Sequence, residues 1–273
     1  MSLEQTIADL VAASNNLTGI INGKVEEIDQ KVDQATSSVP QKVSSMSFQT
    51  FFIDAVSGDD SNDGTSVSPF KTTAPVADKI IPSFSTRINF RGGQTHNLVG
   101  MGYSTVGYVE IMGWDHEALG RPTLKLTSLS HHAETGEDTI YFLNPSGCSV
   151  YFNKVIVDLD CGELTPTGLS GFFRRSAGGV DILASACDFI LGDIPLAHGY
   201  AGWCRADFNI REGVVDATNA SANSKMLLVT SGEDSTSRVE LRQMTFTNTT
   251  AAAQFSAKTD GSNIFSNVDI NAY

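Results

Sequence analysis

The sequence predicts a mainly β protein, built as a parallel β-helix, that follows an N-terminal α-helical coiled coil. Two patterns carry this prediction. Apolar residues recur at alternating steps of four and three near the N-terminus, which is the spacing of a coiled-coil seam. Short runs of the form apolar-x-x-apolar-x-apolar recur after residue 150, as expected of strands that stack on equivalent strands of the next coil. We therefore expect an oligomerisation helix at 1–43, a linker and cap segment at 44–82, and a β-helix domain at 83–273.

The predicted helix has a seam too narrow for packing on its own domain, so we expect it to associate with copies of itself. Two successive steps of four form a stutter at Asn22 and Gly23, both poor helix formers. Pro40 is expected to end the helix at about Val39. The mixture of core residues does not decide between a dimer and a trimer, and a single amphipathic helix lying on the C-terminal domain is the alternative. The seam residues are Leu3, Ile7, Leu10, Leu17, Ile21, Val25, Ile28, Val32 and Val39.

Composition argues against several classes of function. The formal charge of −13 over 273 residues disfavours nucleic acid or anionic membranes as partners, and no apolar run approaches the roughly 18 residues of a membrane span. No phosphate-binding Gly-rich motif is present, and we expect no cofactor. The cysteines form no Cys-x-x-Cys pair, so we expect buried thiols made in a reducing cytosol rather than a zinc site or disulfides. They are Cys148, Cys161, Cys187 and Cys204.

The β part is expected to begin with a strand at 48–56, which is rich in aromatic and β-branched residues. The polar loop that follows has two interpretations. Its Asp and Asn side chains can stabilise a structured loop by bonding nearby backbone amides, or they can supply the oxygens of a calcium site, although no Glu closes an EF-hand loop. We expect the structured loop and no metal. The calcium candidates are Asp59, Asp60, Asn62 and Asp63.

Two stretches resemble known families. The stretch FIDAVSGDDSNDGTSVSPFKT (52–72) resembles the opening of right-handed parallel β-helix proteins of the pectate-lyase-like class, in which such a loop leads to a short helix that caps the solenoid. Residues 74–81 would be that helix. The stretch TIADLVAASNNLTGIINGKVEEID (6–29) resembles the N-terminal coiled coil of bacteriophage tail fibre and tailspike proteins. The order of these two resemblances in one chain implies a phage fibre with a β-helix.

Four copies of the strand pattern are expected to stack as successive coils. They begin at Phe152, Ala184, Leu241 and Phe265, so they lie 32, 57 and 24 residues apart. Another copy, beginning at Arg205, fits between the second and third with one polar mismatch. Earlier runs at 86–90, 105–112 and 122–129 are expected to form the first coils. A β-sandwich is the alternative fold, but hairpin signals such as Asn-Gly between adjacent runs are nearly absent.

A β-helix can also be an enzyme. The resemblance implies paired carboxylates on the surface of those tailspikes that cleave polysaccharide, where they act as acid and base or nucleophile. The catalytic candidates are Asp158 and Asp160, two residues apart beyond a predicted strand, and Asp188, one coil further on. The alternative is that these acids are solvated turn formers, and we expect binding rather than catalysis.

Aromatic residues in loops are typical of saccharide-binding sites, because a flat ring offers apolar area to the face of a sugar. Neighbouring acids could accept hydrogen bonds from sugar hydroxyls. The alternative is that the tryptophans fill gaps between loops and coils. The glycan-binding candidates are Trp114, Asp115, Glu117, Tyr200 and Trp203.

From these features and the resemblance we expect a homotrimeric tail fibre or tailspike of a phage virion, assembled in the host cytoplasm. The helix, about 55 Å long over its seam, would join the protomers or dock on other virion proteins of the tail or baseplate. Loops of the β-helix would bind host surface polysaccharide during adsorption. A polysaccharide depolymerase (glycosidase or lyase) and a purely structural virion fibre or decoration protein are the alternatives. A β-helix ending at Tyr273 is shorter than that of a typical depolymerising tailspike, which favours an attachment or structural fibre.

Overall fold

The chain divides into two compact units, Met1–Ser47 and Phe48–Tyr273. The computed structural model describes residues 2–80, 85–101, 103–104, 107–145, 147–168, 170–174, 179–200, 205–231, 237–255 and 264–269. Among these residues, no helix combines the length and the apolarity that crossing a bilayer requires.

The first unit is a single helix, α1 (Leu3–Ser47), so the predicted coiled-coil segment is helical throughout. The expectation that Pro40 ends the helix at about Val39 was wrong, because α1 continues to Ser47 and the first strand begins at Phe48. Proline inside a helix removes one backbone hydrogen bond and crowds the carbonyl four residues earlier, at a cost of about 3 kcal/mol. In a helix of 45 residues that local cost does not stop the regular hydrogen bonding on either side. The side chain of Val39 lies outside the described residues.

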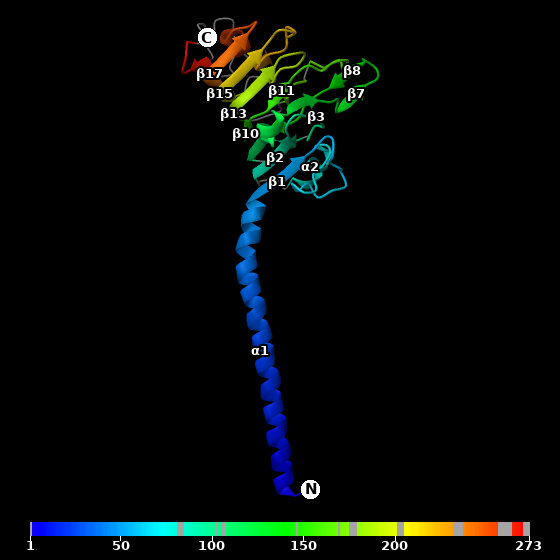
Figure 1. Ribbon diagram of the computed structural model, residues 1–273, viewed down its shortest axis with the longest axis vertical. Helices are drawn as coiled ribbons and strands as arrows, with labels where there is room; N and C mark the ends of the chain where they lie inside the picture. Colours follow the sequence, from blue (N-terminus) through cyan, green and yellow to red (C-terminus); the bar gives the residue numbers. More distant parts are fainter. Residues whose placement is uncertain are drawn as a thin grey trace. The chain divides into compact units, whose positions relative to one another are not determined.

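The second unit is mainly β, as predicted, and its main element is a large parallel sheet curled into a half-barrel (Figure 1). The strands of its longest row all run in the same direction and pair in order of sequence. We call the chain from one strand of this row to the next a repeat. The row consists of β1 (Phe48–Ile53), β2 (Ser85–Arg91), β5 (Tyr108–Trp114), β10 (Cys148–Asn153), β13 (Gly179–Ile190), β15 (Arg205–Asp216), β17 (Ser237–Thr247) and β18 (Ile264–Ser266).

A second row of parallel strands joins the first at the C-terminal half of β13. It contains β3 (Thr95–Leu98), β6 (Thr123–Leu126) and β11 (Ile156–Asp158), and it continues through the C-terminal halves of β15 and β17. A separate parallel sheet contains β12 (Phe173–Arg174), β14 (Ala197–Tyr200) and β16 (Leu227–Ser231). Each repeat from β2 to β17 therefore contributes to more than one row, and the rows share one core.

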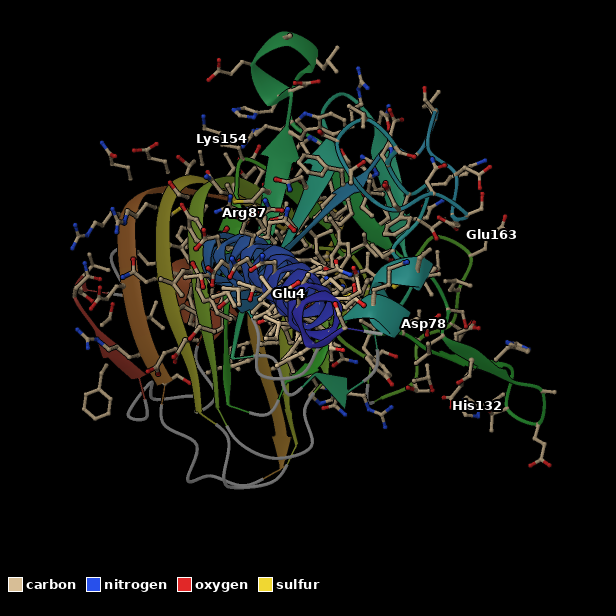
Figure 2. The ribbon with its side chains drawn as sticks, turned by 90° about the horizontal axis from the view of Figure 1, so that it is seen from below. Glu4, Asp78, Arg87, His132, Lys154 and Glu163 are labelled. Atoms are coloured by element: carbon tan, nitrogen blue, oxygen red, sulfur yellow. The ribbon has the colours of Figure 1, made fainter. Side chains whose placement is uncertain are left out.

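The remaining elements are short. Strands β4 (Tyr103–Ser104) and β9 (Asn144–Pro145) form a parallel pair. Strands β7 (Ser130–His132) and β8 (Glu137–Thr139) form an antiparallel hairpin that projects from the rest of this unit, with His132 near its tip (Figure 2). The helices are α2 (Ala74–Lys79), within the predicted cap helix, α3 (His116–Leu119) and α4 (Ala251–Phe255).

The register of the strands tests the predicted repeats. Phe152 pairs with Ala184, which confirms the spacing of 32 residues. Ala184 pairs with Ile210 and Ile210 with Leu241, which confirms the spacing of 57 residues between the second and third copies. The side chains of this ladder, from Ile88 through Ile111 to Leu241, are buried. The inward positions of successive strands thus form the core.

Two predicted copies were placed in the wrong register. The copy beginning at Arg205 was displaced by five residues, because Ile210 occupies the position of Ala184. Gly213 then stands at the position of Cys187, where a Cβ atom would lie 1.8 Å from the carbonyl oxygen of Cys187. The close approach of the two strands requires glycine and so removes the apolar residue on which the pattern depended. The last copy was displaced by three residues, since Phe265 pairs with Arg238 rather than Leu241.

The chain turns from the first row into the second at a bend that recurs in successive repeats. Lys154, Ala186, Glu212 and Gln243 all have left-handed backbone conformations, with φ between 54° and 58°. The residues before them pair in register from strand to strand, as Ser185 does with Arg211 and Arg211 with Arg242. A single left-handed residue in an otherwise extended strand redirects the chain. The stacked bends account for the curl of the sheet.

The core contains many aromatic rings and three thiols. Phe152 lies near the centre of an aromatic cluster, with ring centroids 5.6 Å from Phe172 and 6.1 Å from Phe189. Cys148, Cys161 and Cys187 are buried and free, as predicted, and Cys204 lies outside the described residues. Burial is the main cause that raises the thiol pKa to about 11, about 12 and about 11 in these three residues. They are therefore inert apolar groups of the core at neutral pH.

Candidate functional site

The seam of α1 is apolar and exposed. From Leu3 to Val32 every predicted seam side chain is at least half exposed in the single chain, between 50% for Val25 and 77% for Leu3. Val11 and Ile20 add to the same exposed apolar surface. Water-exposed apolar surface of this extent marks a binding surface in a folded protein.

The four calcium candidates hold their own loop together. Asp59 accepts from the amide of Ser61 at 2.8 Å, Asp63 accepts from the amide of Thr65 at 3.1 Å, and Asn62 donates to the carbonyl of Pro69. Asp60 accepts from the amides of Lys71 and Thr72 and from the Thr72 hydroxyl. These hydrogen bonds are the ones expected if the polar loop after β1 is a structured loop. Within the described ranges no group of three His, Cys, Asp or Glu side chains is arranged to hold a metal.

The first two catalytic candidates share one lysine. The Nζ atom of Lys125, on β6, lies 3.0 Å from Oδ2 of Asp158 and 3.8 Å from Oδ2 of Asp160. The hydrogen bond to Asp158 raises the pKa of Lys125 above its usual value, although partial burial opposes this. Lys125 and Asp158 are register partners on β6 and β11, so the pair is a cross-strand contact of the sheet surface.

The third candidate, Asp188, lies on the strand next to β11, as predicted. It pairs in register with Ile156, two residues before Asp158, so both carboxylates are on the outward face of the second row. Asp188 forms an ion pair with Arg121 and accepts a hydrogen bond from the amide of Val214. Arg121 also donates to the carbonyl of Ala186 at the bend. Each of the three carboxylates therefore lies within ion-pair distance of a basic side chain.

The glycan candidates at the end of β5 are close together but engaged. The ring of Trp114 packs edge-on against Phe52 with centroids 5.1 Å apart, and the guanidinium of Arg91 lies 5.1 Å from its centroid. Asp115, at 3.9 Å, is near the same guanidinium. Glu117 is largely exposed and lies 3.8 Å from Lys154. Trp114 is thus in contact with Phe52 and Arg91 at the end of β5.

The side chains of the other two glycan candidates lie outside the described residues. The backbone of Tyr200 belongs to β14, in the separate three-stranded sheet, and its side chain lies outside the described residues. Trp203 also lies outside them.

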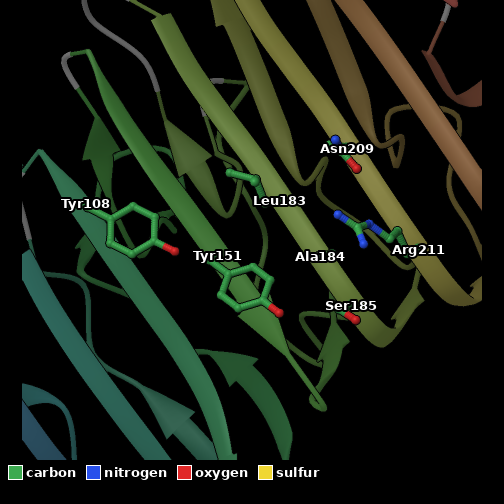
Figure 3. A pocket seen from close by; sticks show the side chains of 7 residues that line it. All are labelled: Tyr108, Tyr151, Leu183, Ala184, Ser185, Asn209 and Arg211. Carbon is green, nitrogen blue, oxygen red and sulfur yellow. The ribbon is translucent and has the colours of Figure 1, made fainter. Parts of the chain in front are cut away.

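A groove that the sequence analysis did not find crosses the outward face of the long row. Its volume is about 250 Å³, and β13 forms its floor. The tyrosine rings of β5 and β10 line one side and side chains of β15 line the other, as Figure 3 shows. We call it the tyrosine–arginine groove. It is lined by Tyr108, Tyr151, Leu183, Ala184, Ser185, Asn209 and Arg211.

An ion pair on one side of the groove and a hydrogen bond on the other hold its walls. Glu110, which is nearly buried, pairs with Arg87 on the adjacent strand. Burial, together with the charge and hydrogen bond of Glu110, raises the pKa of Tyr108, so its phenol stays protonated at neutral pH. On the other side, Nδ2 of Asn209 donates to Oε2 of Glu240 at 3.0 Å. The walls are therefore preorganised before any ligand arrives.

Comparison of the chain with protein families, with characterised proteins and with solved structures gave no match. Two features of the chain itself, the seam of α1 and the groove, therefore indicate what it could bind. The seam is visible in the sequence as a heptad pattern. The groove is not, because its residues come from four strands and meet only once the register of those strands is known.

Proposed function

We propose that the protein is the subunit of a trimeric bacteriophage virion fibre, of the tail fibre or tailspike type, which mediates host adsorption by binding cell-surface polysaccharide. The observation that carries the proposal is the continuous exposed seam of α1, directly followed in the chain by a curled parallel sheet. A helix with such a seam gains its stability by burying it against copies of itself. The fibre would form in the host cytoplasm, in keeping with three free buried thiols.

For the second unit we propose a right-handed parallel β-helix. Three features support it: parallel pairing from each strand to the next in sequence, inward ladders such as Phe152, Ala184 and Ile210, and bends repeated in register. Parallel neighbours need a crossover connection, and crossovers in one sheet are right-handed in nearly all proteins. The loop after β1 supports the cap, because Phe70 and Gly64 bond the edge of β1 at Phe52.

The arrangement suits adsorption. Three copies joined by α1, which is about 68 Å long at 1.5 Å per residue, would present three identical sheets to a repetitive surface. Weak sites then gain affinity through avidity. The N-terminal part of the helix would also dock on another virion protein. The open groove with aromatic side chains supports a saccharide ligand. Binding is favoured over cleavage because the three candidate carboxylates are paired with Lys125 and Arg121.

Light scattering of the full-length protein tests the trimer. The chain mass is 29.2 kDa, so a trimer gives about 88 kDa. The double substitution Leu17→Lys and Ile28→Lys places charges in the seam and is expected to give single chains. The matched control, Asn16→Lys and Gln30→Lys, adds the same charges on the opposite side of the helix and should keep the trimer. A full-length protein that runs as one chain would contradict the proposal.

Binding to an array of purified bacterial surface polysaccharides tests adsorption. The trimer is expected to bind some of them, and the seam variant to bind the same glycans far more weakly through lost avidity. Release of reducing ends or of unsaturated sugar from a bound glycan would instead establish a depolymerase. A trimer that binds neither glycans nor bacterial cells would be a structural fibre.

A further inference from the structure

We propose that the tyrosine–arginine groove binds an acidic sugar residue of a surface polysaccharide, whose ring lies on Tyr108 and Tyr151 and whose carboxylate pairs with Arg211. This inference rests on the proposed function and specifies its ligand. The proposed site lies on the face of the sheet rather than in the loops.

The tyrosine side of the groove suits the face of a sugar ring. Tyr108 and Tyr151 stand on neighbouring strands, which lie about 4.8 Å apart. Leu183 on β13 adds apolar floor between the tyrosines and β15. Both tyrosines are partly buried, so a ligand covers rings that are already held in place, at little cost in side-chain entropy. The hydroxyl of Tyr108 is hydrogen-bonded to Glu110, which holds its ring in place.

The charge on the other side selects an anion. Arg211 is exposed, and among the described residues no carboxylate lies within ion-pair distance of it. Its register partner on β17 is Arg242, which is also exposed and also lacks such a partner within that part of the chain. Arg242 lies one strand outside the groove, so Arg211 is the guanidinium that lines it. A guanidinium binds a carboxylate through two parallel hydrogen bonds, which gives both affinity and orientation.

Acidic groups at the other end of the same strands fix the direction of the ligand. Asp181 and Asp207 are register partners on β13 and β15, four residues before Ser185 and Arg211. At about 3.3 Å per residue they lie about 13 Å away along the strands. Asp181 accepts from Ser149, and Asp207 accepts from the amide of Arg238. An anionic group is thus repelled at the Asp181 end and attracted at the Arg211 end.

The polar groups of the floor and the size of the groove favour the binding of a single sugar residue of a polymer. Ser185 supplies a hydroxyl, and Asn209, whose amide nitrogen is engaged by Glu240, supplies a carbonyl oxygen for a sugar hydroxyl. A volume of about 250 Å³ is below the roughly 300–1,000 Å³ of pockets that enclose a drug-sized ligand. Such a groove holds a single ring while the rest of the chain continues over the sheet.

The test is an array of bacterial polysaccharides that carry uronic acids, sialic acids or pyruvate acetals, each printed beside its carboxyl-reduced or methyl-esterified form, with neutral glycans included. The full-length protein is expected to bind at least one acidic glycan and to lose at least tenfold in affinity for its esterified form. Arg211→Gln should cause a similar loss for the acidic form and little change for the ester. Arg242→Gln is the matched control, since it removes the same charge one strand outside the groove, and it should change affinity less than threefold. Tyr151→Ser should weaken both forms.

The outcomes separate this inference from the proposed function. Binding to neutral glycans only, unaffected by Arg211→Gln, overturns the acidic ligand but leaves polysaccharide adsorption in place. Equal losses for Arg211→Gln and Arg242→Gln overturn the contact with Arg211 in favour of a diffuse field. A lower light-scattering mass for Arg211→Gln shows that this face joins copies of the chain, and that also overturns the inference. No binding to any glycan overturns both proposals.

Discussion

Phe70 fills the space that a side chain at Gly64 would need. A Cβ atom on Gly64 would lie 2.3 Å from the ring of Phe70, and Gly64 has a φ of +79°. Phe70 is fully buried and pairs with Ile53 at the end of β1. The loop therefore closes the edge of β1, where unpaired backbone groups would otherwise invite pairing with another chain.

Gly64→Ala should lower the free energy of unfolding by about 2–4 kcal/mol, from the left-handed backbone and from the clash with a ring that cannot move. Gly136→Ala is the matched control. Gly136 also has a positive φ, of +71°, but a Cβ there meets nothing within 4 Å, so its cost should be about 1 kcal/mol. Urea unfolding at a fixed protein concentration measures both, and equal losses would show that Phe70 yields.

The repeated bend gives a second prediction within a single strand. Ala186 has a φ of +54°, a conformation that glycine adopts without strain, so Ala186→Gly should leave stability unchanged or raise it by up to about 1 kcal/mol. Ala184, two residues earlier, is buried and extended, and Ala184→Gly should cost about 1–2 kcal/mol. Thermal unfolding of the two variants should therefore shift in different directions or by clearly different amounts. A comparable loss for both would contradict the role of the bend.

The stability of the protein should fall in mild acid because of His96. Burial lowers the pKa of this imidazole below its usual 6.5 and outweighs the opposing effects of the Arg91 carbonyl and of Asp54. Its Nε2 atom donates to the Arg91 carbonyl at 2.8 Å, and because burial lowers the pKa, the folded protein holds the neutral ring at neutral pH. The unfolded chain takes up a proton on this residue as the pH falls below about 6.5, while the folded chain does not until a lower pH. The stabilising contribution is thus complete above that value and declines below it, by up to about 1.4 kcal/mol per pH unit.

Urea unfolding between pH 5 and pH 8 measures this decline. His96→Gln keeps a donor near the carbonyl but does not titrate, so the slope between pH 5 and pH 6.5 should become smaller than in the unmodified chain. An unchanged slope would assign the decline to other groups.

The ion pair between Arg121 and Asp188 should contribute to the stability of the fold rather than to catalysis. Both side chains are largely but not fully covered, so a double-mutant cycle with Arg121→Gln and Asp188→Asn should give about 1 kcal/mol of coupling. Asp188→Asn should also leave glycan binding unchanged. If it leaves stability unchanged and instead abolishes release of sugar from a polysaccharide, Asp188 is a catalytic residue.

Parts of the fold that a local sequence pattern determines could be predicted, whereas parts that depend on contacts between distant residues could not. The stacking of Phe152 on Ala184 could be predicted because both runs keep apolar side chains at the inward positions. The stacking of Ala184 on Ile210 could not be predicted, because the pattern requires an apolar residue at position 213. Gly213 stands there, since its backbone lies too close to Cys187 for a side chain. Pro40 misled the prediction of the end of α1, since propensity is a local quantity and the helix extends well to both sides of it.

The candidate sites also divide into those that a local pattern indicates and those that only the fold reveals. The seam of α1 follows from spacing within one segment, and its side chains from Leu3 to Val32 are exposed in the single chain. Trp114 is a glycan candidate by residue type, and its contacts with Phe52 and Arg91 could not be predicted because both residues precede it by many positions. Tyr151 and Arg211 carry no local signal, and only the register of β10, β13 and β15 brings them to one groove.

The repeats vary in length while their bends and inward ladders stay in register. Ile88 to Ile111 spans 23 residues, Ile111 to Phe152 spans 41, and Ala184 to Ile210 spans 26. The difference in repeat length lies in connections such as the β7–β8 hairpin, whose two strands pair with each other and not with the stacked strands. Segments of new length and sequence can therefore be exchanged at these connections without disturbing the core. The stacked strands, with the groove on their outward face, can then be inherited unchanged while the connections between them vary.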